Sequence, residues 1–294
     1  MKVFFVLTKR NIKLFFKDKG LFFSSLITPV ILLVLYVTFL AKVYRNSLAQ
    51  GITDSKLLEA AVGGELVSSF LAVCCVTIAF SSNLVMVQDK VNGAKKDILV
   101  TPVKKSIVSL AYYAGSLAST LTVGLIAVCA GFIYLAIVGW YLSFCDVIFI
   151  LLDVILLGMF GTALSSIVNT FLSTQGQMSA VGTIVSAGYG FICGAYMPIN
   201  SFSDGLKNIF AFFPGTYGTS LVRNHSLAGC FREMEKIGFE RARIDALKEN
   251  LDCRIKFFDN VVSIQAMFAV LVGSILLLIG IYVLINFLRK RKVK

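Results

Sequence analysis

Apolar runs of more than 20 residues alternate with shorter polar stretches along most of the chain. A helix of about 20 predominantly apolar residues crosses the roughly 30 Å of hydrocarbon in a bilayer. Six runs meet this length: 21–41, 62–87, 107–139, 147–171, 177–197 and 261–288. The pattern therefore predicts an all-α polytopic membrane protein with six transmembrane helices, folded as a single domain over residues 1–294.

The first 20 residues show a different pattern, with cations and apolar side chains on opposite sides of a helix. At 100° per residue the cations share one side; they are Lys2, Lys9, Arg10, Lys13 and Lys17. This arrangement predicts an amphipathic interfacial helix over 1–20, lying on the inner leaflet with its cations among lipid headgroups. The alternative is an ordinary positively charged flank that only orients the first span.

The segment 198–260 between the fifth and sixth spans is the largest polar stretch, and we expect it outside the cell. Its first part, Ser201 to Phe213, is apolar but too short to span, and it is bounded by Pro198 and Pro214. This predicts a pair of short re-entrant or interfacial outer helices. The later part, from Phe231 to Phe258, is rich in Glu, Arg, Lys and Leu, which predicts one or two exposed helices.

Charge is sparse and unevenly placed. Of 294 residues 57% are hydrophobic and 15% are charged, and the formal net charge is +12. Three blocks, at 1–20, 88–105 and 289–294, hold 16 of the 28 basic residues and 3 of the 16 acidic ones. Positive loops stay on the cytoplasmic side. We therefore expect a multi-pass plasma-membrane protein with both termini in the cytoplasm. The cations would meet membrane lipid and not nucleic acid.

The sequence offers no catalytic apparatus. It contains no Gly-Lys dipeptide and hence no phosphate-binding P-loop, one histidine, and no metal-ligand spacing. We expect neither an enzyme nor a metal or cofactor on this chain. An ion-driven carrier would need charges within its spans. Glu65 is expected in the first turn of its helix at the interface and Asp146 at a helix boundary. Asp153 lies two turns into the fourth span. It is either a group in a proton or ion relay or a side chain that forms hydrogen bonds within the first turns of its own helix. His225 is expected on a surface or loop.

Small and hydroxylated residues mark a candidate substrate path. Gly182, Ser186 and Gly190 recur every four residues on the fifth span, and Ser81, Ser82 and Asn83 cluster near the inner end of the second. Asp153 is the ionisable candidate for the same path. The alternative is that these residues serve close helix packing and bonds to backbone carbonyls. Cys230 and Cys253, in the outer segment, can form a disulfide if that segment faces an oxidising side.

Two segments carry a family resemblance. Residues 88–105, QDKVNGAKKDILVTPVKK, resemble the loop between spans two and three of ABC-2-type exporter permeases, with an acid, a Gly and a Thr-Pro pair before a basic patch. Residues 196–217, from Tyr-Met-Pro-Ile to Phe-Phe-Pro-Gly-Thr-Tyr, resemble the motif between spans five and six of the same family. The order of arm, spans and outer loop also matches this family.

The resemblance implies a permease that dimerises with a second copy or a paralogue. It would dock separate ABC ATPase (nucleotide-binding) subunits that hold the ATP and magnesium. The docking elements would be the 1–20 helix and the 88–105 coupling loop, with the residues Lys9, Lys13, Lys17, Asp89, Gly93, Lys95, Lys96 and Pro102. Pro102 would end the loop helix before the next span.

We therefore expect the transmembrane permease subunit of an ATP-driven ABC exporter. Its substrate would be an amphipathic compound such as a drug, antibiotic, peptide or lipid-linked molecule. A polysaccharide or glycan export permease is the nearest alternative, because the same layout serves both. A secondary carrier or channel, and a membrane sensor or immunity protein that transports nothing, are alternatives from other classes.

Overall fold

The computed structural model describes residues 2–49, 51–52, 54–258 and 260–288. The basic tail predicted at 289–294, with Arg289, Lys290, Arg291, Lys292 and Lys294, lies outside the described residues. The chain begins with α1 (Lys2–Lys17), α2 (Lys19–Leu35), the π-helical turn η1 (Tyr36–Leu40), α3 (Ala41–Leu48), α4 (Ser55–Ser82), α5 (Leu84–Val91), α6 (Ala94–Val100) and α7 (Lys105–Val138).

The second part holds α8 (Phe144–Phe171), α9 (Gln175–Ile192), the 3-10 turn η2 (Ile199–Ser201), α10 (Asp204–Ala211), α11 (Pro214–Lys236), α12 (Arg241–Asn250) and α13 (Ile264–Leu288). Two short strands, β1 (Lys256–Phe257) and β2 (Asn260–Val261), pair as an antiparallel hairpin between α12 and α13. The fold is thus almost entirely helical, as expected for a polytopic membrane protein.

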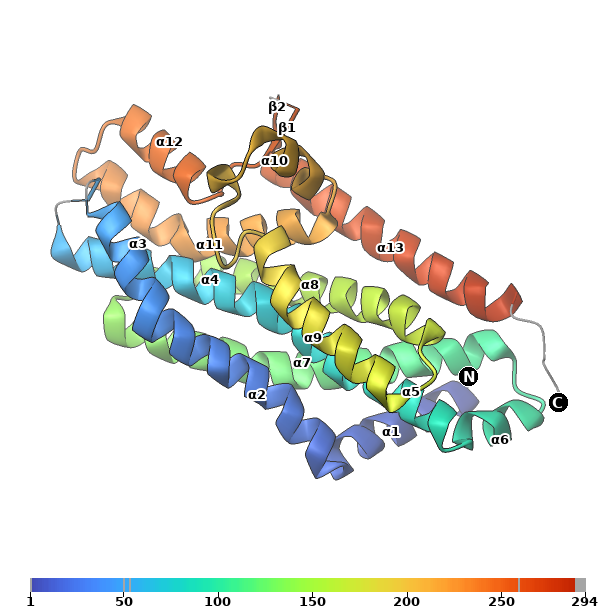
Figure 1. Cartoon of the computed structure of the whole chain (residues 1–294). Helices are drawn as coiled ribbons and strands as arrows, with labels where there is room; N and C mark the ends of the chain where they lie inside the picture. Colours follow the sequence, from blue (N-terminus) through green and yellow to red (C-terminus); the bar gives the residue numbers. More distant parts are fainter. Residues whose placement is uncertain (1, 50, 53, 259, 289–294) are drawn as a thin grey trace.

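Long helices run side by side in one bundle (Figure 1). Within the described residues, five are long and apolar enough to cross a membrane: Lys19–Leu48, Ser55–Val91, Lys105–Val138, Phe144–Phe171 and Ile264–Leu288. They coincide with five of the six predicted spans. The remaining one, at 177–197, contains α9, which ends at Ile192 and carries glutamine in its first turn. The six-span count therefore remains a prediction.

Helix α4 is the centre of the bundle. It packs against α7, α8, α11 and α2, and nearly all of its side chains are buried. Asp54 caps its first turn by accepting hydrogen bonds from the backbone N–H groups of Lys56 and Leu57. Because the helix begins at Ser55, Glu65 lies three turns inside it and is fully buried. The expectation that Glu65 sits in a first turn at the interface is wrong.

The segment between the fifth and sixth predicted spans contains a long helix that the sequence analysis did not anticipate. The short η2 and α10 are present where short helices were predicted, but the 23-residue α11 follows them directly. The first half of α11, from Gly215 to Arg223, is buried on all sides, and the helix packs against α4, α8 and α13. Pro214 occupies its first turn, where a missing N–H costs nothing. This segment therefore contributes to the core instead of lying wholly outside it.

The bundle has two distinct ends (Figure 1). At one, which we call the basic end, α1, α5 and α6 carry the cation-rich segments. At the other, which we call the loop end, α10, α12 and the β-hairpin cover the bundle. The helices α4, α7 and α8 connect the two ends.

Candidate functional site

Helix α1 is fastened to the bundle by one side only. Its buried side chains are Asn11 and Phe15, and the Asn11 amide donates to the carbonyl of Ala111 on α7 at 3.2 Å. A Cβ on Gly115 would lie 2.8 Å from the Cβ of Asn11, so the two helices approach closely. Lys9, Lys13 and Lys17 are all exposed on the outer side.

Asp89 joins three helices at the basic end. It is 6% exposed. It forms a bidentate ion pair with Arg10 on α1, in which Nη2 of Arg10 donates to Oδ1 of Asp89 at 3.0 Å. The hydroxyl of Tyr112 on α7 donates to the same carboxylate at 2.6 Å. The hydrogen bonds to Asp89 raise the pKa of the Arg10 guanidinium. Asp89 therefore holds α1 against α5 and α7, and we call these three residues the Asp89 junction.

The turn after α5 places the remaining predicted docking residues. Gly93 adopts φ +83°, a conformation that glycine accepts without strain and that lets α6 fold back next to α5. Lys95 lies over the Tyr112 ring, 5.5 Å from its centre. Lys96 and Pro102 are exposed, Pro102 in the link between α6 and α7. The structure thus gathers the predicted docking residues of 1–20 and 88–105 at one end.

Lys90, which the sequence analysis did not single out, ties α5 to α8. Its ammonium donates to three carbonyls at the end of α8, those of Asn169 at 2.6 Å, Thr170 at 2.8 Å and Leu172 at 2.9 Å. A cation suits the unpaired carbonyls and negative dipole of a helix C-terminus. No local pattern could reveal this role, because the carbonyls belong to a helix far along the chain.

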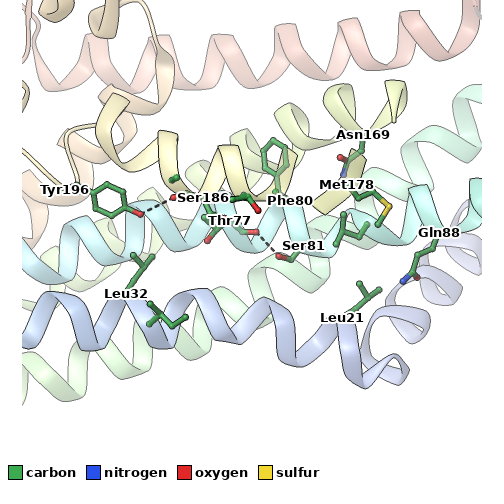
Figure 2. A pocket seen from close by; sticks show the side chains of 15 residues that line it. Leu21, Leu32, Thr77, Phe80, Ser81, Gln88, Asn169, Met178, Ser186 and Tyr196 are labelled. Atoms are coloured by element: carbon green, nitrogen blue, oxygen red, sulfur yellow. Dashed lines mark hydrogen bonds between the residues drawn. The ribbon is translucent and has the colours of Figure 1, made fainter. Parts of the chain in front are cut away.

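A cavity of about 610 Å³ lies between α2, α4, α5 and α9 (Figure 2). Its wall is mainly apolar, and its polar groups are neutral hydroxyls and amides. The described lining residues, none of which is an acid, a Lys, an Arg or a His, are Leu21, Ile31, Leu32, Thr77, Phe80, Ser81, Leu84, Gln88, Asn169, Met178, Gly182, Thr183, Ser186, Ala187 and Tyr196. A volume of this size and a wall of this kind are typical of small-molecule sites.

The predicted path residues separate into two groups. Ser81, Gly182 and Ser186 line the cavity. Ser82 and Asn83 are buried behind it, where the Asn83 amide donates to Ser165 at 3.0 Å and Ser166 at 2.7 Å; this bond set holds α4 against α8.

Gly190 faces the ring of Tyr196, whose carbons would lie 2.2–2.6 Å from an added Cβ. It is therefore a packing position at the outer end of α9. Asp153 is elsewhere, at the loop end.

The family comparison matches the model of the ABC-2 type transporter to residues 2–225, about three quarters of the chain. The chain belongs to the ABC-2 type transporter family. This transporter is thus a multi-pass membrane permease of the ABC class, a kind of subunit that generally has no catalytic site of its own and typically pairs with an ABC ATPase. No curated protein matches the chain.

At its loop end the transporter buries two acidic side chains around an arginine, a grouping that the sequence analysis missed. Arg223 on α11 is 1% exposed and contacts Glu65 at 2.8 Å, Asp252 at 3.5 Å and the Gly194 carbonyl at 2.9 Å. Asp252 also accepts from the backbone N–H of Ile199. We call Glu65, Arg223 and Asp252 the Arg223 cluster. The one sequence signal was an arginine at the end of an otherwise uncharged stretch, 208–222.

A second buried pair joins Asp153 to His225. The imidazole Nδ1 lies 2.6 Å from Asp153 Oδ2, and the ring stacks on Phe149 at 4.9 Å. His225 is therefore a helix residue packed between α8 and α13, and the expectation of a surface or loop position is wrong. Asp146, at the start of α8 as expected, caps that helix and pairs with Arg232.

Two further predictions concern the cysteines and metals. Cys230 and Cys253 are both buried. The disulfide between them stays a prediction. Within the described residues no group of three or more His, Cys, Asp or Glu side chains could hold a metal ion.

Proposed function

We propose that this ABC-2 type transporter is the permease subunit of an ATP-driven exporter for amphipathic compounds. A separate ABC ATPase would dock at the basic end, on α1 and the α5–α6 turn, with this end in the cytoplasm. ATP and magnesium would bind to the partner, and a second permease copy or a paralogue would complete the assembly. The cavity between α2, α4, α5 and α9 would hold the exported compound.

One observation carries this proposal: three consecutive residues of α5 connect the docking elements to the cavity. Gln88 lines the cavity and donates to Asp18, which caps α2, at 3.4 Å. Asp89 holds α1 and α7, and Lys90 holds the end of α8. A displacement of α1 or α5 by a docked ATPase would therefore reach the cavity wall through direct contacts.

The lining favours an amphipathic compound over a glycan. A polysaccharide presents hydroxyls on every sugar and would need many paired polar groups, whereas most of the surface of this wall is apolar, contributed by seven Leu, Ile, Phe, Met and Ala side chains and the Tyr196 ring. Neutral hydroxyls and amides among apolar side chains suit a compound with a large apolar body and few polar atoms.

The energy source is tested with inverted membrane vesicles that contain the chain and its candidate ATPase. We expect uptake of fluorescent amphipathic dyes that requires ATP and persists when ionophores dissipate ion gradients. Uptake driven by an ion gradient in vesicles with the chain alone would overturn the proposal.

The docking surface is tested with charge reversal on the exposed side of α1. The triple variant Lys9→Glu, Lys13→Glu, Lys17→Glu should lose co-purification of the ATPase and ATP-driven uptake, because it reverses the charge of the proposed docking surface. The fold should survive, since all three lysines are exposed and their side chains form no hydrogen bond or ion pair within the described residues. The matched control is Lys42→Glu with Lys56→Glu, at exposed positions near the loop end. Equal loss in both variants would contradict docking at the basic end.

A further inference from the structure

A hydrogen-bond donor without a partner lies in the cavity wall. Asn169, in the last turn of α8, is 1% exposed and is one of the lining residues. Its side-chain Nδ2 has no hydrogen-bond partner, and it is the one buried side-chain nitrogen or oxygen of the described lining in this state. A buried donor in this state is unfavourable, and an acceptor supplied by a ligand relieves the penalty.

Other polar groups of the lining already have partners. The Gln88 amide donates to Asp18 at 3.4 Å, Ser81 donates to the Thr77 carbonyl at 3.1 Å, and Tyr196 donates to the Ser186 carbonyl at 3.0 Å (Figure 2). Satisfied groups gain little from a ligand. The unpaired amide of Asn169 is therefore the polar feature of the wall that discriminates most between ligands.

The backbone of Asn169 is fixed by Lys90. The three carbonyls that receive the Lys90 ammonium include that of Asn169 itself, at 2.6 Å. Met178, from the start of α9, belongs to the same lining. Methionine repacks easily, so the wall can adjust around a ligand that reaches the amide.

We propose that the Asn169 amide donates a hydrogen bond to an oxygen of the exported compound, and that Lys90 is the positioning residue that sets the amide in place. The inference rests on the proposed function and narrows its substrate. The described lining has no cation or carboxylate, so the compound is neutral, largely apolar, and bears a carbonyl, ether or hydroxyl oxygen.

The test measures binding to the purified full-length chain in detergent, without ATPase. Benzophenone and diphenylmethane form a matched pair, because they differ only in the carbonyl oxygen. We expect the wild type to bind benzophenone roughly tenfold more tightly. Near-ultraviolet irradiation should then crosslink benzophenone to the α8–α9 end of the cavity, with Met178 among the labelled residues.

Substitutions at two positions separate the roles. Asn169→Leu should weaken benzophenone binding roughly tenfold and leave diphenylmethane binding unchanged. Lys90→Met should reduce the preference for the ketone, and Lys90→Arg should restore most of it. Asn92→Leu and Lys104→Met, at exposed positions of the same loop, are the controls and should keep the wild-type preference.

Three results would overturn the inference: no binding or no ketone preference in the wild type, a preserved preference in Asn169→Leu, or equal weakening of both compounds. None of them touches the requirement for ATP in vesicles, so failure here is distinguishable from failure of the proposed function.

Discussion

The Arg223 cluster at the loop end and the Asp89 junction at the basic end differ in how far water reaches their ion pairs. At the loop end, the Arg223 cluster is closed off from water, with side chains 0–2% exposed. At the basic end, the Arg10 side chain of the Asp89 junction is 32% exposed while Asp89 is buried. Burial makes the loop-end cluster costly to break, because each remaining charge would be stranded. The basic end keeps a partner that water can reach.

This contrast fits the division of labour in the proposed function. A docking helix that transmits movement needs attachments that shift without unfolding the bundle, and a half-exposed ion pair has a modest energy. The loop end ties α4, α9, α11 and the segment after α12 to one guanidinium. We infer that the loop end is the rigid part and the basic end the adjustable part.

The largest effect is expected from Arg223→Met. It leaves the carboxylates of Glu65 and Asp252 buried without their cation, which costs about 3–5 kcal/mol. The midpoint of thermal unfolding in detergent should fall by about 10 °C. The control is Arg254→Met, whose partner Asp245 is exposed, with an expected cost below about 1 kcal/mol. Equal shifts in the two variants would contradict the contrast between buried and exposed pairs.

Glycines at close helix contacts sharpen the comparison. Gly229→Ala on α11 would place a Cβ 2.0 Å from the backbone carbonyl oxygen of Tyr141, which cannot move away. We expect a cost of about 2–3 kcal/mol, measured as thermal unfolding in detergent. Gly115→Ala on α7 would place a Cβ 2.8 Å from the Cβ of Asn11, a less severe overlap that a small displacement of α1 can relieve, so about 1–2 kcal/mol is expected.

The matched control for both is Gly124→Ala, also on α7. A Cβ there meets nothing within 4 Å, and alanine favours a helix over glycine by up to about 1 kcal/mol. A gain in stability is therefore expected. A larger loss at Gly115 than at Gly229 would reverse the ranking of the two ends.

Asp89→Asn tests the basic end directly. The amide keeps the shape but removes the charge that Arg10 and Tyr112 share, at an expected cost of about 1–2 kcal/mol. Because Arg10 can turn to water, α1 should loosen while the bundle stays folded. Limited trypsin digestion should cut α1 several times faster than in the wild type. Asp97→Asn, at an exposed position on α6, should leave the rate unchanged; equal acceleration in both would refute the junction.

The features that the sequence predicted correctly are those that depend on the composition of one helical turn or one span. Five of the long helices follow directly from apolar runs, since length and hydropathy decide which segments can cross a bilayer. The fifth predicted span is the exception: α9 contains glutamines, glycines and serines, which lower its hydropathy even though it lies alongside the bundle in Figure 1. Predicted docking residues gathered at one end because two short segments carry them.

Pairing between distant segments could not be predicted. Arg223 finds Glu65 on α4 and Asp252 after α12, and no local pattern links the three. The stretch around α11 was interpreted as outer loop because its mean hydropathy is low, yet its glycines and small hydroxyl residues allow close packing against α4 and α8. Asp89 was predicted as a docking residue, but its partner Arg10 was counted among the surface cations.

The smallest expected effect is the difference between the two ends in their response to salt. The Debye length falls from about 10 Å at 0.1 M to about 3 Å at 1 M, which weakens pairs that water reaches and spares those it does not. Raising salt should therefore speed trypsin cleavage of α1 about twofold. At the loop end, in protein whose cysteines have first been reduced, maleimide labelling of the buried Cys253, next to Asp252, should stay slow.

The Asp89→Asn variant isolates the cause of that salt effect. Its junction has already lost the charge, so salt should change its cleavage rate little, and any change in trypsin itself would appear in both proteins. If Cys253 labelling rises with salt as strongly as α1 cleavage, then water reaches the Arg223 cluster. The loop end would then be as adjustable as the basic end, and the rigid part of the transporter would have to lie in the α4–α7–α8 core alone.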